Sequence, residues 1–511
     1  MDTFFSLQTP TKIPVDVYST HYRITAGKRG ELCNGLFDIL PVINRLRIPQ
    51  FNGHGEYVGS IRYYRYIGGR FYLPIYTLSM LTFRLNNICQ SDKLFSYEIV
   101  KHDPNPTCHV SGLVMQSSWV DRPEHAAAIA HLMDDKDKPL RGNDLQTGKG
   151  KTYVSTKVST LLGHPTLVIC ESLVEQWVQN YLEKTCLKED QIFVIQGIES
   201  ILQLIDIAVN HKDKRPAVII GSLRTVANYA DGTDNAYRDI MSINELMTLL
   251  EVGTCIHDEI HLSTHAHVLI DLVMNIKNTL VLSATPKRSD KPQQAIFVKV
   301  FPKGIIGGAN EYDKYVNTRI VPYHLNTHRS EKKFTNFGYG YSHVKYESVI
   351  IQSPDLCSQF FKFLDRSVQA EYANRASSSN DKCLIFVSTV RMAKWLKDKL
   401  ESKYRVFGFD VRTYLHEDPI DNLMDADIII STPKSCGVGK DIPKLITVIN
   451  TVSMASEPGL EQMFGRLRKL EGKELRFIDM VNNTVQSHAR HLAVKKDVYK
   501  KRSKEFEIGD V

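Results

Sequence analysis

A glycine-rich run ending in Gly-Lys-Thr is the clearest chemical signal in the sequence. Residues 145–152 read Leu-Gln-Thr-Gly-Lys-Gly-Lys-Thr and lead into a stretch compatible with a helix. Glycines let backbone N–H groups face phosphate oxygens, and a helix N-terminus favours negative charge. The lysine would neutralise phosphate charge, and the threonine hydroxyl could ligate Mg²⁺. The pattern predicts a phosphate-binding loop made of Gln146, Thr147, Gly148, Lys149, Gly150, Lys151 and Thr152.

Acidic and hydroxyl side chains follow two later apolar runs. Asp258 and Glu259 come directly after residues 254–257, and Ser283-Ala284-Thr285 follows residues 279–282. Asp258 would hold Mg²⁺ through water, and Glu259 would orient and deprotonate an attacking water. Because ligands bind at the carboxyl edge of a parallel α/β sheet, these motifs are expected to converge there with the phosphate loop.

Short β-rich runs alternate with longer helical stretches through two regions of the chain. This alternation predicts an α/β fold of two RecA-like parallel-sheet domains in tandem, with a small α+β N-terminal domain. One departure is the stretch 139–144, which is a poor strand although it precedes the phosphate loop. The predicted strands are Thr166–Cys170, Ala217–Ile220, Thr254–His257 and Thr279–Leu282 in the first domain, and Cys383–Val387, Asp427–Ile430, Ile446–Asn450 and Arg476–Asp479 in the second.

The first 115 residues are rich in aromatic, β-branched and glycine residues. Residues 57–74 predict a hairpin that turns at Gly68-Gly69, followed by a helix over Thr77–Asn87. The expected boundaries are 1–115 for this accessory domain, 116–315 and 316–484 for the two RecA-like domains, and 485–511 for a basic helical extension. The polar segment 328–343 is expected to be a loop or an insertion.

Composition excludes several classes of protein. The chain has 511 residues, 42% of them hydrophobic, and a formal net charge of +7. These values are ordinary for a globular protein and exclude disorder, collagen and a disulfide miniprotein. The nine cysteines are scattered without a Cys-x-x-Cys pair, which argues against a zinc module and fits a reducing compartment. Without a secretory signal or a membrane span, a soluble intracellular protein is expected, in the host cytoplasm if the source is viral.

The order of these motifs resembles the superfamily-2 helicases. The resemblance covers about residues 122–479 and includes the Asp-Glu-x-His motif at 258–261 and Ser-Ala-Thr at 283–285. In the second domain it continues through Ile385-Phe386-Val387-Ser388, Ser431-Thr432, residues 437–442 and residues 462–469. The resemblance implies ATP and Mg²⁺ as cofactors, with metal contacts from Thr152 and Asp258.

Further roles are implied by the resemblance alone. His125 stands where the family has an adenine-reading glutamine, which leaves nucleotide selectivity open. Gln462 would face His261 across a cleft and, with Ser283 and Thr285, couple nucleotide state to domain closure. Arg466, assisted by Arg468, is the favoured arginine finger, because Lys469 stands where the family usually has its last arginine. Gly439 and Asp441 are the implied nucleotide contacts of the second domain.

Contacts to a single strand are expected from hydroxyls, amides and a few longer side chains. Such contacts to phosphates carry no sequence preference. Each of these residues could equally cap a helix or stabilise a turn. The candidates are Ser172, Gln176, Ser222, Arg224, Thr225, Ser388, Ser431 and Thr432.

The N-terminal region resembles the small DNA-binding domain of the UvsW-type phage recombination helicases. The match rests on the glycine turn, the strand Arg-Phe-Tyr-Leu-Pro at 70–74 and the helix that follows. An accessory domain whose aromatic residues only form a core is the competing interpretation. Together the patterns predict an ATP-dependent DNA helicase or translocase in recombination, repair or replication, with single-stranded or branched DNA as partner and no membrane.

Three other functions stay open at this point. The first is an RNA or transcript-release helicase, since poxvirus-type enzymes share the core motifs. The second is a motor that moves along double-stranded DNA without unwinding it. The third is an ATP-switched binding protein, which the intact Asp258-Glu259 pair disfavours.

Overall fold

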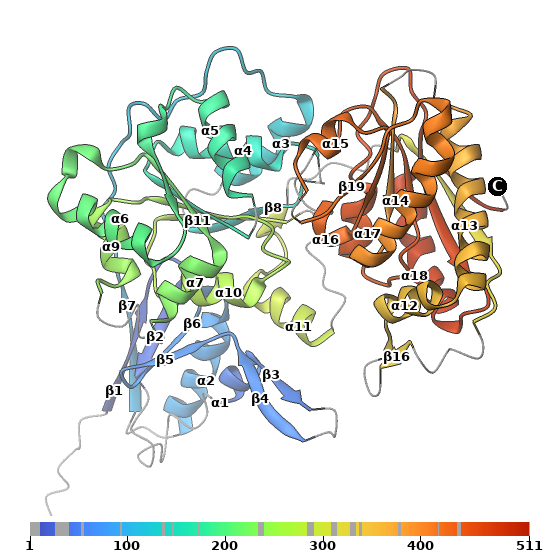
Figure 1. The fold of residues 1–511 in the computed structure, drawn as a ribbon. Coiled ribbons are helices and arrows are strands. Elements are labelled where there is room, and N and C mark those ends of the chain that lie inside the picture. The colour runs from blue at the N-terminus through green and yellow to red at the C-terminus, as the bar shows by residue number, and fades with distance from the viewer. Residues whose placement is uncertain are drawn as a thin grey trace, which may run out of the picture. The chain divides into compact units, whose positions relative to one another are not determined.

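The chain divides into two compact units, residues 1–310 and 311–511, in a computed structural model (Figure 1). Each unit is described by itself. The structure describes residues 11–25, 40–52, 56–91, 95–134, 138–145, 148–171, 173–232, 240–283, 291–307, 314–327, 334–336, 340–376, 380–416, 418–436 and 441–509.

The N-terminal region folds around a five-stranded sheet of order β5-β6-β2-β1-β7. All neighbours in this sheet are antiparallel except the parallel pair β1 and β7. The predicted hairpin at Gly68-Gly69 is confirmed by the pairing of β5 with β6, and the predicted helix is α2. The elements are β1 (Thr11–Val17), β2 (His21–Thr25), α1 (Leu40–Asn44), a separate hairpin of β3 (Arg47–Phe51) and β4 (Tyr57–Arg62), β5 (Arg65–Ile67), β6 (Arg70–Pro74), α2 (Leu78–Ser91) and β7 (Phe95–Lys101).

A seven-stranded sheet, parallel throughout, forms the rest of the first unit, with strand order β10-β11-β9-β12-β13-β8-β14. Its strands are β8 (Leu140–Asn143), β9 (Thr166–Cys170), β10 (Ile192–Ile195), β11 (Val218–Ser222), β12 (Thr254–His257), β13 (Asn278–Leu282) and β14 (Ile306–Gly307). Its helices are α3 (Pro123–Asp134), α4 (Lys151–Leu162), α5 (Val174–Lys184), α6 (Ile198–Asn210), α7 (Leu223–Asp231), α9 (Ile243–Leu249), α10 (Thr264–Asp271) and α11 (Lys291–Val300).

Alternation along the buried strands assigns the helices to the two faces of this sheet. Leu167 and Ile169 of β9 pack with α6, α7 and α9, whereas Val168 and Cys170 pack with α3, α4 and α5. Successive side chains of a strand point to opposite faces, so a strand that is apolar at every position must be covered on both. The whole of β9 is buried, as a central strand of a three-layer domain requires.

The expectation that residues 139–144 make a poor strand is wrong. Leu140–Asn143 is strand β8, between β13 and β14, and all four residues are buried. Burial at this place in the sheet overrides the weak β-propensity of the sequence Leu-Arg-Gly-Asn. Arg141 donates to Asn278 Oδ1 at 2.7 Å. A Cβ at Gly142 would come within 2.6 Å of Val281 and Ile306 side chains, so only glycine fits between these neighbours.

A second seven-stranded sheet, again all parallel, forms the second unit, with order β19-β20-β18-β21-β22-β15-β23. Its strands are β15 (Val316–Tyr323), β18 (Lys382–Phe386), β19 (Val411–Tyr414), β20 (Ile428–Ser431), β21 (Leu445–Asn450), β22 (Leu475–Asn482) and β23 (Ser503–Ile508). Its helices are α12 (His343–Gln352), α13 (Pro354–Val368), α14 (Val390–Tyr404), α15 (Asp421–Asp425), α16 (Pro433–Cys436), α17 (Glu457–Phe464) and α18 (Gln486–Arg502).

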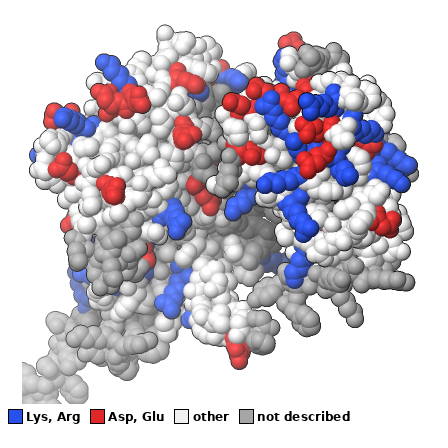
Figure 2. Space-filling model, viewed as in Figure 1, with Lys and Arg blue, Asp and Glu red and all other residues white. Residues whose placement is uncertain are grey.

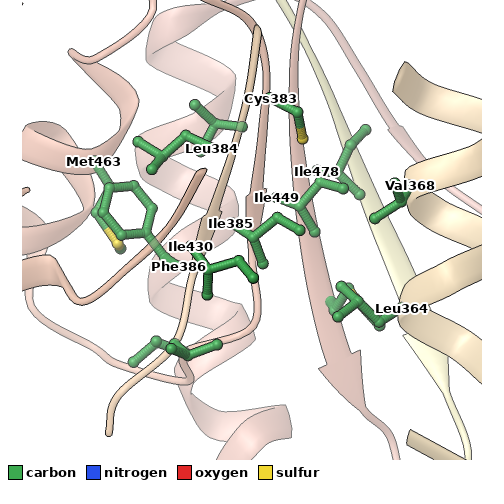
Figure 3. Close-up of a cluster of buried hydrophobic side chains, with 14 of the residues drawn as sticks. Leu364, Val368, Cys383, Leu384, Ile385, Phe386, Ile430, Ile449, Met463 and Ile478 are labelled. Carbon is green, nitrogen blue, oxygen red and sulfur yellow. The ribbon is translucent and has the colours of Figure 1, made fainter. Parts of the chain in front are cut away.

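Two sheets of this kind in tandem, with a mixed N-terminal sheet, confirm the predicted architecture of two RecA-like domains and an accessory domain. In the core of the second unit, Ile385, Ile449 and Ile478 of neighbouring strands lie side by side (Figure 3). Leu364 and Val368 of α13 cover one face of these strands, and Met463 of α17 lies on the other.

The last residues do not form a separate basic extension. Helix α18 packs on the second sheet, and β23 pairs with β15 as its edge strand. Two of the helix's cations are buried in ion pairs, Lys495 with Asp479 at 2.9 Å and Arg502 with Glu461 at 2.7 Å. The sequence predicts a basic helical extension over these residues, but the two ion pairs belong to the interior of the domain.

The segment 328–343 is described only in part. Within it, β16 (Thr335–Asn336) and β17 (Gly340–Tyr341) form a short antiparallel hairpin ahead of α12. No helix in the part of the chain that the structure describes is long and apolar enough to cross a membrane.

Candidate nucleotide and strand sites

The phosphate loop enters helix α4 through a left-handed glycine. Gly150 has φ +86° and precedes Lys151, the first residue of α4. A Cβ at Gly150 would lie 2.6 Å from Nε2 of His125. Glycine is therefore required twice, once for its backbone angle and once for the close approach of the imidazole. Gln146 and Thr147 lie outside the described residues.

His125 hydrogen-bonds to the backbone of this loop. Its Nδ1 accepts from the backbone N–H of Arg122 at 3.3 Å, which leaves Nε2 to donate to the carbonyl of Lys149 at 3.2 Å. The ring packs on Tyr153 of α4, and the residue is 4% exposed. The imidazole is thus engaged with the loop backbone, whereas the resemblance had implied a position that reads the base.

Lys151 and Glu259 form an ion pair at the carboxyl edge of the first sheet. The Lys151 ammonium donates to Oε1 of Glu259 at 2.5 Å, and both side chains are largely buried. His261 Nδ1 lies 3.2 Å from the other oxygen of Glu259 and 3.0 Å from the Ser283 hydroxyl. Residues from two strand ends and the phosphate loop therefore meet, as the sequence predicted. Thr285 lies outside the described residues.

The backbone at Glu259 adopts an angle that few side chains tolerate. Its φ is +46°, in the left-handed region, where most L-residues are strained. The flanking N–H groups hold this turn, since Asp258 donates to Ile169 and Ile260 donates to Leu282, each at 2.9 Å. Strained residues persist where the surroundings fix them, and they concentrate at functional sites.

Asp258 is a buried carboxyl beside that turn. It is 6% exposed, and its Oδ2 accepts from the indole N–H of Trp177 at 2.9 Å. Burial and the neighbouring Glu259 raise the pKa of Asp258 to about 6, against the lowering effects of Lys151 and Trp177. A bound cation would lower the pKa again, because it favours the ionised carboxylate.

The oxygen donors here fit Mg²⁺. The Asp258 carboxylate and the half-buried Thr152 hydroxyl, on the second residue of α4, are hard ligands of the kind that this ion takes from proteins. The first unit thus holds two carboxylates, one of which could bind a cation, and an ammonium at the edge where a helix N-terminus begins.

The candidate strand contacts of the first unit divide into surface residues and helix caps. Gln176 and Arg224 are exposed. Ser222 is the N-cap of α7 and accepts from the N–H of Thr225, whose own hydroxyl accepts from Gly197. Ser172 lies outside the described residues.

In the second unit the candidates are mostly engaged inside the domain. Ser431 is fully buried and donates to the carbonyl of Tyr414. Thr432 caps α16 by accepting from the N–H of Ser435 at 3.1 Å. Ser388 is half-buried, and its N–H donates to the buried Glu347 at 2.6 Å. The Ser431 hydroxyl is therefore not at the surface, where the sequence interpretation needed it.

The residues that resemble an arginine-finger motif surround the end of α17. Arg466 is 1% exposed and donates from Nε to the carbonyl of Gln462 at 3.3 Å. The Nε2 of Gln462 is buried and has no hydrogen bond within the described residues. Arg468 is more exposed and pairs with the exposed Asp441 at 3.3 Å. Gly439 lies outside the described residues.

Two buried networks escaped the sequence interpretation. His257, the residue before Asp258, forms hydrogen bonds with Asp271 at 2.7 Å and with His267 at 2.8 Å. At the carboxyl edge of the second sheet, Tyr341 bonds to both His343 and His488. Single histidines carry no periodic signal, so only the fold brings these rings together.

Charge is unevenly distributed on the face that Figure 2 shows. Lys and Arg side chains mix with Asp and Glu over the second unit, whereas much of the first unit is uncharged on this face. The net charge of +7 is therefore not gathered into one basic surface on the side shown.

Comparison with known proteins adds little to the geometry of the structure. No family model matches the sequence, and no curated protein matches it. Among solved structures, the chain is similar to the one titled "The crystal structure of T4 UvsW", over 98% of this chain and 100% of that chain, with 14% identity and a TM-score of 0.35. At this identity and TM-score, the activity of that protein does not transfer to this chain.

Proposed function

We propose that the chain is an ATP-dependent motor that moves along nucleic acid. The observation that supports this best is the cluster of Lys151, Asp258 and Glu259 at the carboxyl edge of a parallel sheet, next to a phosphate-type loop. Lys151 would bind the β- and γ-phosphates, and its ammonium would then leave Glu259. Glu259, released from the lysine, would orient and deprotonate the attacking water.

Mg²⁺, when bound, would neutralise charge that develops on the phosphates. Thr152 and Asp258 are the residues proposed to hold it. Gln146, Thr147, Gly148, Lys149 and Gly150 are the proposed backbone cradle, and His125 would stabilise this cradle through its bond to Lys149. Gln462, Arg466, Arg468, Gly439 and Asp441 stay proposed participants in hydrolysis, and His261, Ser283 and Thr285 are proposed to relay nucleotide state.

DNA is the proposed substrate, with strand separation or branch migration in recombination, repair or replication as the proposed outcome. Gln176 and Arg224 are the best-placed strand contacts, because they are exposed. Ser172, Ser222, Thr225, Ser388 and Thr432 stay weaker candidates. Backbone N–H groups and uncharged side chains bind phosphates without reading sequence, which suits a motor.

The N-terminal domain is proposed to contact the nucleic acid as well. Arg45, Arg84 and the exposed Phe83 line a cavity of about 290 Å³ between α1 and α2. Neither these helices nor α11, whose Lys299 lies 3.4 Å from the Arg45 carbonyl, contains an Asp or a Glu. A basic surface with an exposed aromatic ring suits phosphates and stacked bases.

One assay separates the proposed function from its rivals. Phosphate release is measured with no nucleic acid, with single-stranded DNA, with a four-way junction and with RNA. The proposal expects DNA, above all the branched form, to stimulate release, and expects Lys151→Ala to abolish it while DNA binding persists. Stronger stimulation by RNA would favour a transcript-release helicase. Stimulation by duplex without unwinding would favour a double-strand translocase.

A further inference from the structure

Trp177 makes a hydrogen bond that packing alone does not require. Its indole N–H donates to Oδ2 of Asp258 at 2.9 Å, and the two residues are 1% and 6% exposed. An indole N–H is a donor only, so a buried tryptophan needs an acceptor, and a backbone carbonyl would serve. Here the acceptor is the carboxylate proposed to bind the metal, and a bond to an ionised acceptor is stronger and more directional than a neutral one.

Helix α5, which carries Trp177, is fixed on its buried side to the phosphate-loop helix. Asn180 donates to Thr156, and the Tyr181 hydroxyl lies 3.1 Å from that of Ser159, both partners being on α4. Gln176, the neighbour of Trp177 in the chain, is exposed and is a proposed strand contact. One turn of α5 therefore presents a polar side chain to solvent and an N–H donor to Asp258.

The bond from Trp177 acts on the rotamer of Asp258. A fixed donor on one carboxylate oxygen restricts rotation of the group. Partners of this kind orient metal ligands, and their loss typically weakens metal binding about 10- to 100-fold.

We propose that Trp177 is a positioning residue that orients the Asp258 carboxylate for Mg²⁺ and links metal affinity to the position of α5. This inference rests on the proposed function, because it takes Asp258 as a metal-binding residue. A nucleic-acid strand bound at Gln176 would displace α5 or restrict its motion. Either change would reach Asp258 through the indole.

The test is metal binding rather than turnover. Mn²⁺ or Mg²⁺ is titrated into the full chain with a non-hydrolysable ATP analogue, and the half-saturating concentration is measured for wild type and Trp177→Phe. The phenylalanine keeps an aromatic ring, smaller than the indole, and removes the donor. We expect the half-saturating concentration to rise about 10- to 100-fold, with weaker hydrolysis recovered at high Mg²⁺.

Tyr181→Phe is the matched control. Tyr181 lies one turn further along α5, is equally buried, and its hydroxyl bonds to Ser159 instead of Asp258. This variant is expected to keep the wild-type metal affinity. Equal half-saturation in wild type and Trp177→Phe, or an equal shift in both variants, overturns the positioning role.

Two further measurements keep the outcome decisive. If Trp177→Phe does not fold, Trp177→3-benzothienylalanine replaces only the N–H by sulfur and gives the same comparison. Single-stranded DNA should change the metal half-saturation of wild type, and this change should shrink in Trp177→Phe. A change that persists in the variant overturns the link through α5. A wild type that binds no metal with the nucleotide would instead overturn the proposed function, and the inference with it.

Discussion

The carboxyl edges of the two parallel sheets are built from different chemistry. The first edge gathers an ammonium and two carboxylates, with Glu259 held at a left-handed φ of +46°. The second is lined by the Tyr341, His343 and His488 network, and the charged pair of Lys495 and Asp479 is buried in its interior. Strain and an excess of carboxylates at one edge suit catalysis, whereas a buried ion pair and a hydrogen-bonded histidine network at the other suit a rigid support.

The largest expected effect is on the first edge. Glu259→Gln removes the proposed base but keeps a side chain that can accept from Lys151. Phosphate release should fall about 10²- to 10⁴-fold, the usual contribution of a general base. The thermal unfolding midpoint should barely change. Normal turnover would place the base elsewhere, and a large loss of stability would make this edge resemble the second one.

The second edge should respond in the opposite way. Lys495→Met leaves Asp479 charged and without its ammonium in the interior, which typically costs about 3–5 kcal/mol. Denaturant unfolding should show this loss, and Asp479→Asn combined with Lys495→Met should recover much of it. If the single variant is as stable as wild type, the pair is not the support that the comparison takes it to be.

Acid should weaken the second unit through His488. Burial, and then the positive neighbours His343, Lys495 and His491, lower the pKa of His488 to about 2. In the unfolded chain this histidine has a pKa near 6.5 and binds the proton more readily. Its contribution to stability is therefore present above pH ~6.5 and is lost as pH falls. The loss is about 1.4 kcal/mol per pH unit.

Unfolding free energies measured between pH 7 and 5 test this effect. His488→Gln should flatten the dependence, because Gln does not titrate and can still accept from Asn482 and donate to Tyr341. Substitution of the exposed His416 by Gln should leave the dependence as in wild type. An unchanged slope in the His488 variant would contradict the assignment.

The smallest expected effect separates surface from buried candidates for strand contact. Ser431→Ala should cost about 1 kcal/mol of stability, the value of one hydrogen bond, and leave strand affinity unchanged. Gln176→Ala should weaken strand binding without loss of stability. Fluorescence anisotropy with labelled single-stranded DNA measures the strand affinity of both variants, and denaturant unfolding measures their stability. Reduced affinity in the Ser431 variant would bring the second edge back into the strand path.

Hydrophobic patterns predict the strands correctly where the local sequence and the burial in the fold agree. Thr166–Cys170 and Thr254–His257 were predicted to the residue, because continuous apolar runs flanked by helical stretches have few alternatives. Leu140–Asn143 escaped because its residues are poor strand formers that tertiary burial nevertheless holds in the sheet. The basic extension predicted over 485–511 is instead part of the second domain, because charge in a sequence does not show which lysines find buried partners.

The motif order in the sequence is enough to predict the meeting of Lys151, Asp258 and Glu259 and the tandem architecture. Asp258 and Glu259 directly follow an apolar strand, and Lys151 stands at the end of the phosphate loop. A parallel sheet brings such strand ends and loops to one edge. Tertiary structure alone decided which polar groups are engaged. It turned His125 toward the Lys149 carbonyl, buried Ser431, and joined Trp177 to Asp258. These pairings join residues far apart in the chain, and local sequence carries no record of the distances between them.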